Sequence, residues 1–573
     1  MSRNTYWPYA RCILQKRWAL MGVVCILIAH TVERAEGQGL SGTPVSQPQS
    51  GAAASQGNGA GSLPVNTLKV RQIRVIGSTV FSAAELSAIT KAYVERGKLS
   101  PEDLEEIRLA LTRYYVDRGY ATSGAVLRSQ TVADGILTYE IIEGKITNIE
   151  VENNRWFKED YIRKRLALGT DPPVQLQALQ ERLLLLEQDP RIERLNIEIR
   201  PGLQRGESYL NARVHERHPF GVALGFDNYQ SPSVGAERGF ITLSHSNLTG
   251  WGDILSVTYG RSPGLRLQIN ASYNIPLNAY DTTLGLRYQR NQTVVVESPF
   301  QDLDIDSHSD VTSITLRHPV YRTLTQEFAV YLQLEYLLNK TSLLGMPFPF
   351  SSGDQDDDGK TADTALRLSL QWLHRTQNQV TAIRSRFSVG VDLFNVTIND
   401  SSEFPDGHFF AWLGQFQWVR RMNAFELQDF QLLLRMDVQL ATEPLLPLEQ
   451  IAVGGRHSVR GYRESTMIRD NAVIVSLESR IPLLRAKPWA DYLELAPFFD
   501  FGHAENTKQP SPDLSTIYSI GIGLRWALSF TKPWPWHSQF EIYWGYPLKD
   551  IPTGDGNLQD LGLHMQLVIA NSF

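Results

Sequence analysis

The feature that most constrains the fold is a regular alternation of apolar and polar residues that runs from Pro219 to Phe573. In the segment LRLQINASYN, every second residue from Leu265 to Tyr273 is apolar and the residues between them are polar. The segment FQLLLRMDVQL, from Phe430, follows the same pattern, and no long apolar helix interrupts the region. A period of two places the apolar side chains on one face of a strand. Segments of about ten such residues are typical of transmembrane β-strands.

Sixteen alternating segments can be counted, and an even number suits a closed barrel made by one chain. They begin near residues 220, 239, 253, 264, 282, 312, 327, 365, 382, 409, 429, 472, 492, 516, 538 and 561. The links after the second, fourth, sixth and eighth segments are short, whereas those after the fifth, seventh and eleventh are long. A soluble β-sandwich or propeller would also show short alternating strands, but it does not explain this pattern of link lengths. We therefore predict a transmembrane barrel with its short turns at one end and its long loops at the other.

The final segment, LGLHMQLVIANSF, is predicted to close the barrel and ends on an aromatic residue, Phe573. Such an ending resembles the recognition signal used by the barrel-assembly machinery. The residues expected to face outward alternate along it, and they are Leu561, Leu563, Met565, Leu567 and Ile569.

The N-terminal residues 1–37 have the order of a secretory signal peptide. Four basic residues precede the apolar run Ala19–Ala29, and the small-residue site Ala35-Glu36-Gly37 follows it. The run is too short to span a bilayer comfortably, although an uncleaved N-terminal anchor is the alternative. Both cysteines, Cys12 and Cys25, lie within this segment, so the mature chain contains none. An exported protein without cysteines avoids misoxidation, which fits a bacterial envelope protein.

Between the signal peptide and the barrel, the sequence predicts a flexible linker and two small α+β modules. Residues 38–67 are rich in Gly, Ser, Ala, Gln and Pro and cannot repay the entropy of ordering. Residues 68–144 and 145–217 each read as strand, helix, helix, strand, strand, which is an internal repeat that leaves a sheet edge available. In the first module, Ser100 followed by Pro101 marks the start of a helix. The formal net charge of −6 is mild, and no clustered basic face suggests nucleic-acid binding.

Two short motifs add a resemblance to this organisation. The stretch VGGRHSVRGYRE, Val453–Glu464, is rich in glycine and arginine and falls in the sixth long-loop position, about residues 442–470. The motif VRGY within it and the pattern F-x-D-x-G in FFDFG resemble those of the TpsB transporters, the outer-membrane haemolysin secretion/activation proteins of the ShlB, FhaC and HecB type. The residues that match are Val459, Arg460, Gly461 and Tyr462 in the loop, and Phe498, Asp500 and Gly502 in a strand.

The strand alternation places the F-x-D-x-G residues on the inner face of the barrel, since the residues between them, Phe499 and Phe501, take the outward parity. We therefore expect the loop to fold back into the lumen and Arg460 to pair with Asp500. A guanidinium stays charged and can donate two parallel hydrogen bonds to a carboxylate. Gly461 would allow a sharp turn beside it. Because desolvation opposes the attraction, such a pair fixes the position of the loop more than it adds net stability.

Two inward-facing glycines on the next strand, Gly521 and Gly523, are expected to leave room for packing against the wall. His457 is read as a loop histidine, although it would be able to titrate in the lumen. No amphipathic helix precedes the first module within residues 38–64. Either a helical plug of the kind found in some relatives is absent, or the inserted loop alone restricts the lumen.

The stretch GDQDDDGK begins like a calcium loop, with Asp354, Asp356 and Asp358 at suitable spacing. Its twelfth position is Ala365 instead of glutamate, so a solvated acidic loop is favoured. No nucleophile elbow, paired metal ligands or phosphate loop is found. We expect no catalytic residues, no metal, no cofactor and no enzymatic activity.

The resemblance implies a membrane all-β protein: a sixteen-stranded barrel over residues 218–573 in the outer membrane of a Gram-negative bacterium, preceded by two periplasmic POTRA domains. It also implies type V, two-partner secretion. The POTRA domains would recognise the N-proximal secretion domain of a TpsA-type exoprotein, and the barrel would export it unfolded, with or without activating it. Outer-membrane lipids and, during biogenesis, the barrel-assembly machinery are the other implied partners, and nucleic acid is not one. An outer-membrane assembly factor of the same superfamily is the alternative, and a passive porin, which needs no POTRA domain, is a weaker one.

Overall fold

The computed structural model describes residues 67–132, 134–350, 358–399, 404–424, 427–530, 535–551 and 556–571. The predicted signal peptide and the predicted linker up to residue 66 lie outside the described residues, as does Phe573. The chain divides into two compact units. One contains the first module up to residue 118 and residues 123–142, and the other contains residues 119–122 and everything from residue 143 onward.

The first module is a three-stranded sheet with two helices. Its helices are α2 (Ala83–Arg96) and α3 (Pro101–Val116), and its strands are β2 (Gln72–Ile76), β4 (Gly124–Leu127) and β5 (Ile136–Ile142). The sheet order is β2-β5-β4, in which β5 runs parallel to β2 and antiparallel to β4. A two-residue strand β1 (Leu68–Lys69) pairs with β3 (Lys98–Leu99). Strands β2 and β4 are therefore the two edges of the sheet.

Capping and apolar burial explain why these helices form. Ser82 before α2 and Ser100 before α3 each make a capping box, which satisfies backbone N–H groups at the helix start. The predicted helix start at Ser100 is confirmed. Along α3, Ile107 and Leu111 are fully buried, which is the apolar stripe that a helix needs to pack on a sheet.

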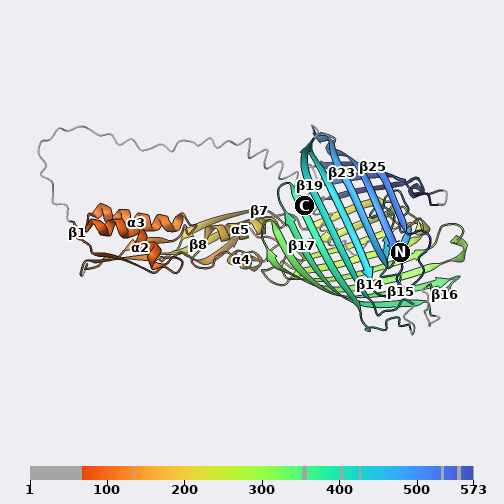
Figure 1. Cartoon of the computed structure of the whole chain (residues 1–573), viewed down its shortest axis with the longest axis horizontal. Coiled ribbons are helices and arrows are strands. Elements are labelled where there is room, and N and C mark those ends of the chain that lie inside the picture. The colour runs from red at the N-terminus through yellow and green to blue at the C-terminus, as the bar shows by residue number, and fades with distance from the viewer. Residues whose placement is uncertain are drawn as a thin grey trace. The chain divides into compact units, whose positions relative to one another are not determined.

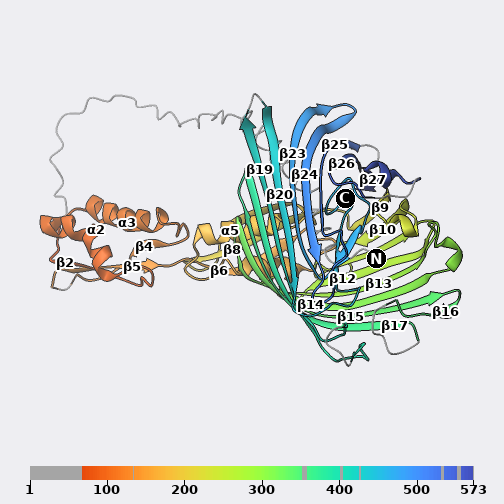
Figure 2. The ribbon, with the colours of Figure 1, turned by 45° about the vertical axis from the view of Figure 1, so that its right-hand side comes forward.

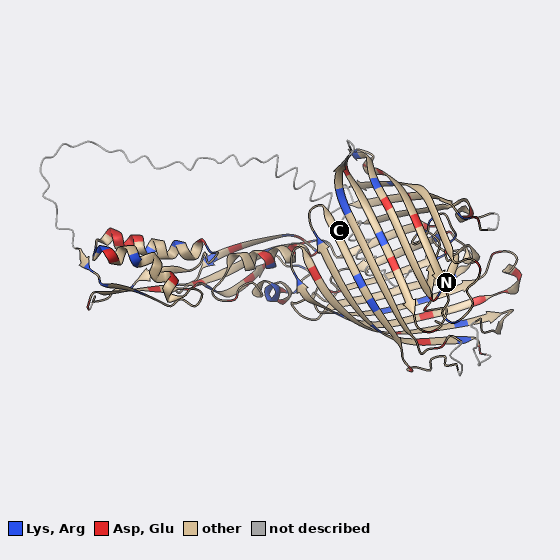
Figure 3. Ribbon diagram, viewed as in Figure 1, with Lys and Arg blue, Asp and Glu red and all other residues tan. Residues whose placement is uncertain are grey.

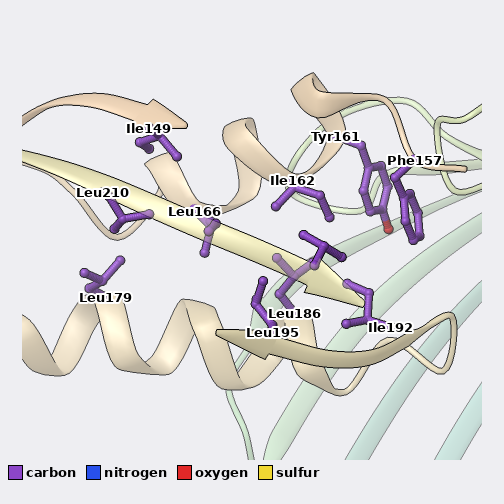
Figure 4. Packing of buried hydrophobic residues seen from close by; sticks show 12 residues of the cluster. Ile149, Phe157, Tyr161, Ile162, Leu166, Leu179, Leu186, Ile192, Leu195 and Leu210 are labelled. Atoms are coloured by element: carbon purple, nitrogen blue, oxygen red, sulfur yellow. The ribbon is translucent and has the colours of Figure 1, made fainter. Parts of the chain in front are cut away.

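The second module repeats this topology within the larger unit. It contains β6 (Lys145–Glu152), α4 (Glu159–Ala167), α5 (Leu176–Glu187), β7 (Ile192–Pro201) and β8 (Glu207–Glu216). The sheet order is β6-β8-β7, in which β8 is parallel to β6 and antiparallel to β7. Figure 4 shows its core, in which residues of both helices and of the strands interdigitate, among them Ile149, Phe157, Tyr161, Ile162, Leu166, Leu179, Leu186, Ile192, Leu195 and Leu210. None of the helices among the described residues is both long and apolar enough to cross a membrane.

A closed barrel of sixteen strands follows, as predicted. Figure 1 shows its strands tilted across the wall, and Figure 2 shows β27 beside β9, where the barrel closes. All neighbouring strands are antiparallel. The largest offset from a predicted start is at the sixth strand, expected near residue 312 and found from Asp306.

The sixteen strands are β9 (Phe220–Asp227), β10 (Arg238–His245), β11 (Ile254–Arg261), β12 (Leu265–Pro276), β13 (Thr283–Val294), β14 (Asp306–Arg322), β15 (Gln326–Leu343), β17 (Lys360–Arg375), β18 (Gln379–Gly390), β19 (Phe410–Ala424), β20 (Leu427–Ala441), β23 (Asn471–Lys487), β24 (Ala490–Glu505), β25 (Thr516–Phe530), β26 (Trp536–Pro547) and β27 (Leu563–Asn571). The two-residue strand β16 (Met346–Pro347) pairs with β15 inside a long loop.

Alternation assigns the two faces of the wall. Phe499, predicted to face outward, is 41% exposed, whereas the next residue, Asp500, predicted to face inward, is fully buried. Figure 3 shows basic and acidic residues distributed along the barrel strands. The prediction for Leu561 is wrong: this residue lies in the 3-10 helix η4 (Leu558–Leu561), and β27 begins at Leu563. Asn557 caps η4, and the short helix interrupts the alternation.

The second module contacts the short-turn end of the barrel. The N–H of Lys158 donates to the carbonyl of Gly250 at 2.9 Å, in the turn between β10 and β11. Trp251, in the same turn, packs against the core of the module. Arg165 of α4 forms an ion pair of 2.6 Å with Asp281, in the turn between β12 and β13. The module therefore lies at the end of the barrel opposite the long loops.

Candidate functional site

The candidate site is the long link between β20 and β23, residues 442–470, which we call loop six. Its two short strands, β21 (Ile451–Val453) and β22 (Met467–Arg469), pair with each other and form a stem. Gly454 and Gly455, directly after β21, have φ angles of +112° and +97°, which a residue with a side chain rarely adopts. At Gly455 a Cβ would lie 2.4 Å from a carboxylate oxygen of Glu464. These glycines let the chain turn back at the stem.

The tip of loop six lies inside the barrel, and Arg460 binds its wall. Its backbone N–H and its Nε donate to Oδ2 of Asp500 at 3.0 and 2.7 Å, and its Nη2 donates to Oδ1 at 2.8 Å. Arg460 also pairs with Glu478 through Nη1, and its Nη2 donates to the hydroxyl of Ser476 at 3.1 Å. The side chains of Arg460 and Asp500 are 3% and 0% exposed. The predicted pairing of Arg460 with Asp500 is therefore present, and Glu478 is a second carboxylate that the sequence analysis missed.

Two aromatic rings form a platform for the arginines of the loop. The guanidinium of Arg460 lies 3.6 Å from the ring centre of Phe498, and that of Arg456 lies 4.0 Å from the ring centre of Tyr543. A Cβ at Gly521 would come within 2.4 Å of the Phe498 ring. A Cβ at Gly523 would likewise come within 2.3 Å of the Tyr543 ring. These rings occupy the space predicted at the two inward glycines of β25, and the arginines of the loop make cation–π contacts with the rings.

The other residues of the two motifs fit one another in shape. A Cβ at Gly502 would lie 2.8 Å from a methyl group of Val459, so the glycine makes room for that side chain. Gly461 has a φ of +90° and packs against the backbone of Gly545. The hydroxyl of Tyr462 lies 3.0 Å from the carbonyl of Tyr518. Each of the seven motif residues thus contributes to the contact between loop six and the wall.

A balanced set of charges surrounds this contact. Arg456 donates to Glu541 at 2.9 Å, and Arg525 pairs with Glu494 at 3.0 Å. Burial tends to lower the pKa of the Arg460 guanidinium, but the attraction of the carboxylates around it outweighs this effect and raises the pKa above its usual value. Arg460 therefore stays protonated, and the contact does not switch with pH through this group.

Loop six has a second point of attachment that sequence reasoning did not find. Glu449, before the stem, receives two hydrogen bonds from Arg367 of β17, at 2.6 and 3.0 Å. Arg367 also donates to Glu335 of β15 at 2.8 Å. All three side chains are at least 96% buried. The inward parity of Arg367 and Glu335 was a usable signal, but nothing in the local sequence links them to Glu449.

Further contacts join the tip to neighbouring long loops. Arg463 forms an ion pair with Asp560, which follows β26. It forms a second ion pair, of 2.7 Å, with Glu297, which follows β13. The ring of His457 packs edge-on against that of Tyr229, in the link that follows β9, with 5.4 Å between the ring centres. In the predicted calcium-like stretch, Asp354 and Asp356 lie outside the described residues, and Asp358 pairs with Lys360 at 2.6 Å.

The arrangement has one physical consequence. The loop fills part of the lumen and is held at both the Arg460 and the Glu449 contacts by buried charge-assisted hydrogen bonds, which are strong and directional. Any displacement of the loop from the lumen would require these contacts to break. The site is therefore suited to holding and releasing a segment of the protein.

Comparison with known proteins places this architecture. Residues 206–526 match the family model of the haemolysin secretion/activation protein ShlB/FhaC/HecB, and residues 68–144 match that of the ShlB-type POTRA domain. The outer membrane transporter CdiB of Dickeya dadantii (strain 3937) is 23% identical over 81% of this chain and 82% of that protein. The hemolysin transporter protein ShlB of Serratia marcescens is 24% identical over 70% of each chain. The structure of CdiB from Escherichia coli matches with a TM-score of 0.64 and 21% identity, over 90% of this chain and 92% of that one.

The family model covers more than half of the chain, and the solved structure confirms the fold. The resemblance drawn from the VRGY and F-x-D-x-G motifs is thus confirmed. The chain belongs to the ShlB/FhaC/HecB family of haemolysin secretion/activation proteins, the outer-membrane transporters of two-partner secretion.

Proposed function

We propose that this chain is the pore through which one exoprotein, carrying an N-proximal secretion domain, leaves the cell unfolded. The two modules, whose sheets share one strand order, are both POTRA domains that lie in the periplasm and capture the exoprotein. The barrel spans the outer membrane and conducts it. The observation that carries the proposal is the position of loop six, which is held in the lumen by Arg460 and Asp500.

The contacts of the second module support its periplasmic position. It touches the turns that contain Gly250 and Asp281, which belong to the short-turn end of the barrel. In outer-membrane barrels the short turns face the periplasm. A chain held by the module would be at the mouth of the pore before it folds.

The sheets of both modules support the capture of an unfolded chain. In each sheet the last strand in the chain lies in the middle, so the first and second strands are edges. An edge strand has unpaired backbone groups that can pair with an extended peptide, independent of much of its sequence. The modules can thus bind the exoprotein as an added strand. The outer membrane has no ATP, so folding outside the cell would give the movement its direction.

The experiment is export of a large secreted protein encoded beside this gene, measured in the medium of cells that carry either the natural chain or Arg460→Ala. We expect export by the natural chain and its loss in the variant, with an assembled barrel in both. An unchanged level of export by the variant would refute the role of the contact between Arg460 and Asp500. A general loss of outer-membrane proteins when this chain is depleted would instead indicate an assembly factor, and leakage of small solutes without any exported protein would indicate a passive porin.

A further inference from the structure

A band of three arginines lies on the inner face of β17 and β18, away from the VRGY contact. We define the arginine band as Arg367, Arg384 and Arg386. The strand register places Arg386 opposite Ser369 and Arg384 opposite Gln371. All three therefore share the inward parity of Ser369, which is 1% exposed. The band is a local concentration of positive charge within the lumen.

The carboxylates around the band do not match its charge. Arg367 binds Glu335 of the wall and Glu449 of loop six. The guanidinium of Arg386 makes no ion pair with any of the described carboxylates, and its buried Nε has no hydrogen-bond partner among them. Only one of the two carboxylates, Glu335, belongs to the wall. The other belongs to a loop that must move if the pore is to open.

The opposite part of the wall is built differently. There Arg460 pairs with Asp500, Arg456 with Glu541, and Arg525 with Glu494 at 3.0 Å. Each of these arginines has a carboxylate partner on the wall itself. The arginine band therefore differs from this part of the same barrel, where each of the three arginines is neutralised by a wall carboxylate.

Glu449 shows what kind of ligand the band accepts. Nη1 of Arg367 donates to one oxygen of this carboxylate at 3.0 Å, and Nη2 donates to the other at 2.6 Å. This two-point geometry is the one in which a guanidinium binds carboxylates best. When loop six leaves, Glu335 still holds Arg367 in place, and the edge of the guanidinium that held Glu449 becomes available. Wall-bound arginines then outnumber wall carboxylates at this point.

We propose that the arginine band is a carboxylate-binding site of the open pore, that Glu449 occupies it at rest, and that acidic side chains of the exported polypeptide occupy it during transport. The inference rests on the proposed function for the identity of the occupant. Its physical basis is a buried guanidinium that already binds a carboxylate of loop six, next to a second guanidinium, that of Arg386, without an ion pair to the described carboxylates. Transient binding at this site would exchange an internal carboxylate for that of the passing chain.

The test uses the purified full-length protein in planar lipid bilayers at low salt, where screening is weak. The probe is an oligoglutamate of about twenty residues, compared with an oligoglutamine of the same length. Block of the ion current is titrated for the natural chain, for Glu449→Gln, and for the double variant Arg384→Gln/Arg386→Gln. Arg290→Gln is the matched control, because Arg290 is exposed and pairs with Asp310 on the outer face of the barrel.

We expect oligoglutamate to block the natural channel at a lower concentration than oligoglutamine. Half-block should need roughly tenfold less oligoglutamate in Glu449→Gln and roughly tenfold more in the double variant, since a charge-assisted hydrogen bond contributes about one decade of affinity. The control should behave as the natural chain. Equal block by both probes, or no change in either variant, would overturn the proposal. If the double variant fails to assemble, Glu449→Gln alone decides between these outcomes.

This assay contains no exoprotein, so it separates the two proposals. If export fails while block by oligoglutamate still depends on the arginine band, the proposed export function is refuted and the carboxylate-binding site stands. If export succeeds while block by oligoglutamate is independent of the arginine band, the carboxylate-binding site is refuted and the proposed export function stands.

Discussion

Replacing Arg460 with alanine should release the tip of loop six from the wall. The substitution removes the guanidinium that donates to Asp500, Glu478 and Ser476. Asp500 is fully buried and would lose the guanidinium that compensates it. Breaking one side of a buried ion pair costs about 3–5 kcal/mol, because the remaining charge is left without compensation.

The structure indicates the lower end of this range. Two donors to Asp500 remain after the substitution, namely the backbone N–H of residue 460 at 3.0 Å and the hydroxyl of Ser476 at 2.6 Å. We therefore expect a loss of about 3 kcal/mol in the free energy that keeps the loop docked. This corresponds to roughly a hundredfold rise in the ratio of undocked to docked loop.

Labelling of a single cysteine can measure this ratio. The chain has no cysteine besides Cys12 and Cys25. Val459 is fully buried in the docked loop, so a cysteine introduced there reacts with a bulky maleimide only when the loop leaves the wall. The labelling rate of Val459→Cys should rise about a hundredfold when Arg460→Ala is added.

Arg266→Ala is the matched control, because the Arg266 side chain is 54% exposed and forms a surface ion pair with Asp306. Surface pairs contribute at most about 1 kcal/mol, so this variant should label like the parent. An unchanged labelling rate in Arg460→Ala would refute the argument that the buried pair holds the loop.

Three further results are expected. Gly461→Ala should raise the labelling rate of Val459→Cys at least about tenfold. The reason is that Gly461 has a φ of +90° and that a Cβ there would lie 2.9 Å from the carbonyl carbon of Gly545. A labelling rate equal to that of the parent would contradict this. Leu111→Ala should destabilise the first module by about 2–5 kcal/mol, since Leu111 is fully buried, and hydrogen exchange along α3 would show it; unchanged exchange would argue against the packing described. In the second module, burial tends to raise the pKa of Asp189, but the attraction of Arg191 outweighs it and the pKa lies below the usual 3.8. The stabilisation that this ion pair gives the second module is therefore complete above about pH 4 and is lost as the pH falls through the lowered pKa. Protection of β7 from hydrogen exchange, corrected for intrinsic rates, should fall at low pH in the natural chain and not in Asp189→Asn.

Much of the barrel was predictable because its physics is local. Each strand has one face toward the outside and one toward the lumen, so alternation reports both the strand and its parity, as at Phe499 and Asp500. The alternation fails where a different local interaction takes over. At Leu561 the chain is in the 3-10 helix that the capping box of Asn557 starts. The alternation of apolar and polar residues continues through Leu561 and therefore predicted a strand there.

The site was predictable only in part. The pairing of Arg460 with Asp500 came from matching two motifs to a family, combined with the parity of one strand. Glu478 has the same inward parity on the neighbouring strand and is a candidate on that ground, but the choice among inward carboxylates depends on the path of the loop. The contact between Glu449 and Arg367 joins positions 82 residues apart, and no periodicity encodes such a contact.

The central claim is that this chain exports a polypeptide through a pore that loop six occupies. It is tested most directly by measuring the exoprotein encoded beside the gene in the culture medium and in the periplasm, for the natural chain, Arg460→Ala and Arg266→Ala. We expect the exoprotein in the medium with the natural chain and with Arg266→Ala, and its retention in the periplasm with Arg460→Ala. Equal amounts in the medium for all three, or none for the natural chain, would contradict it.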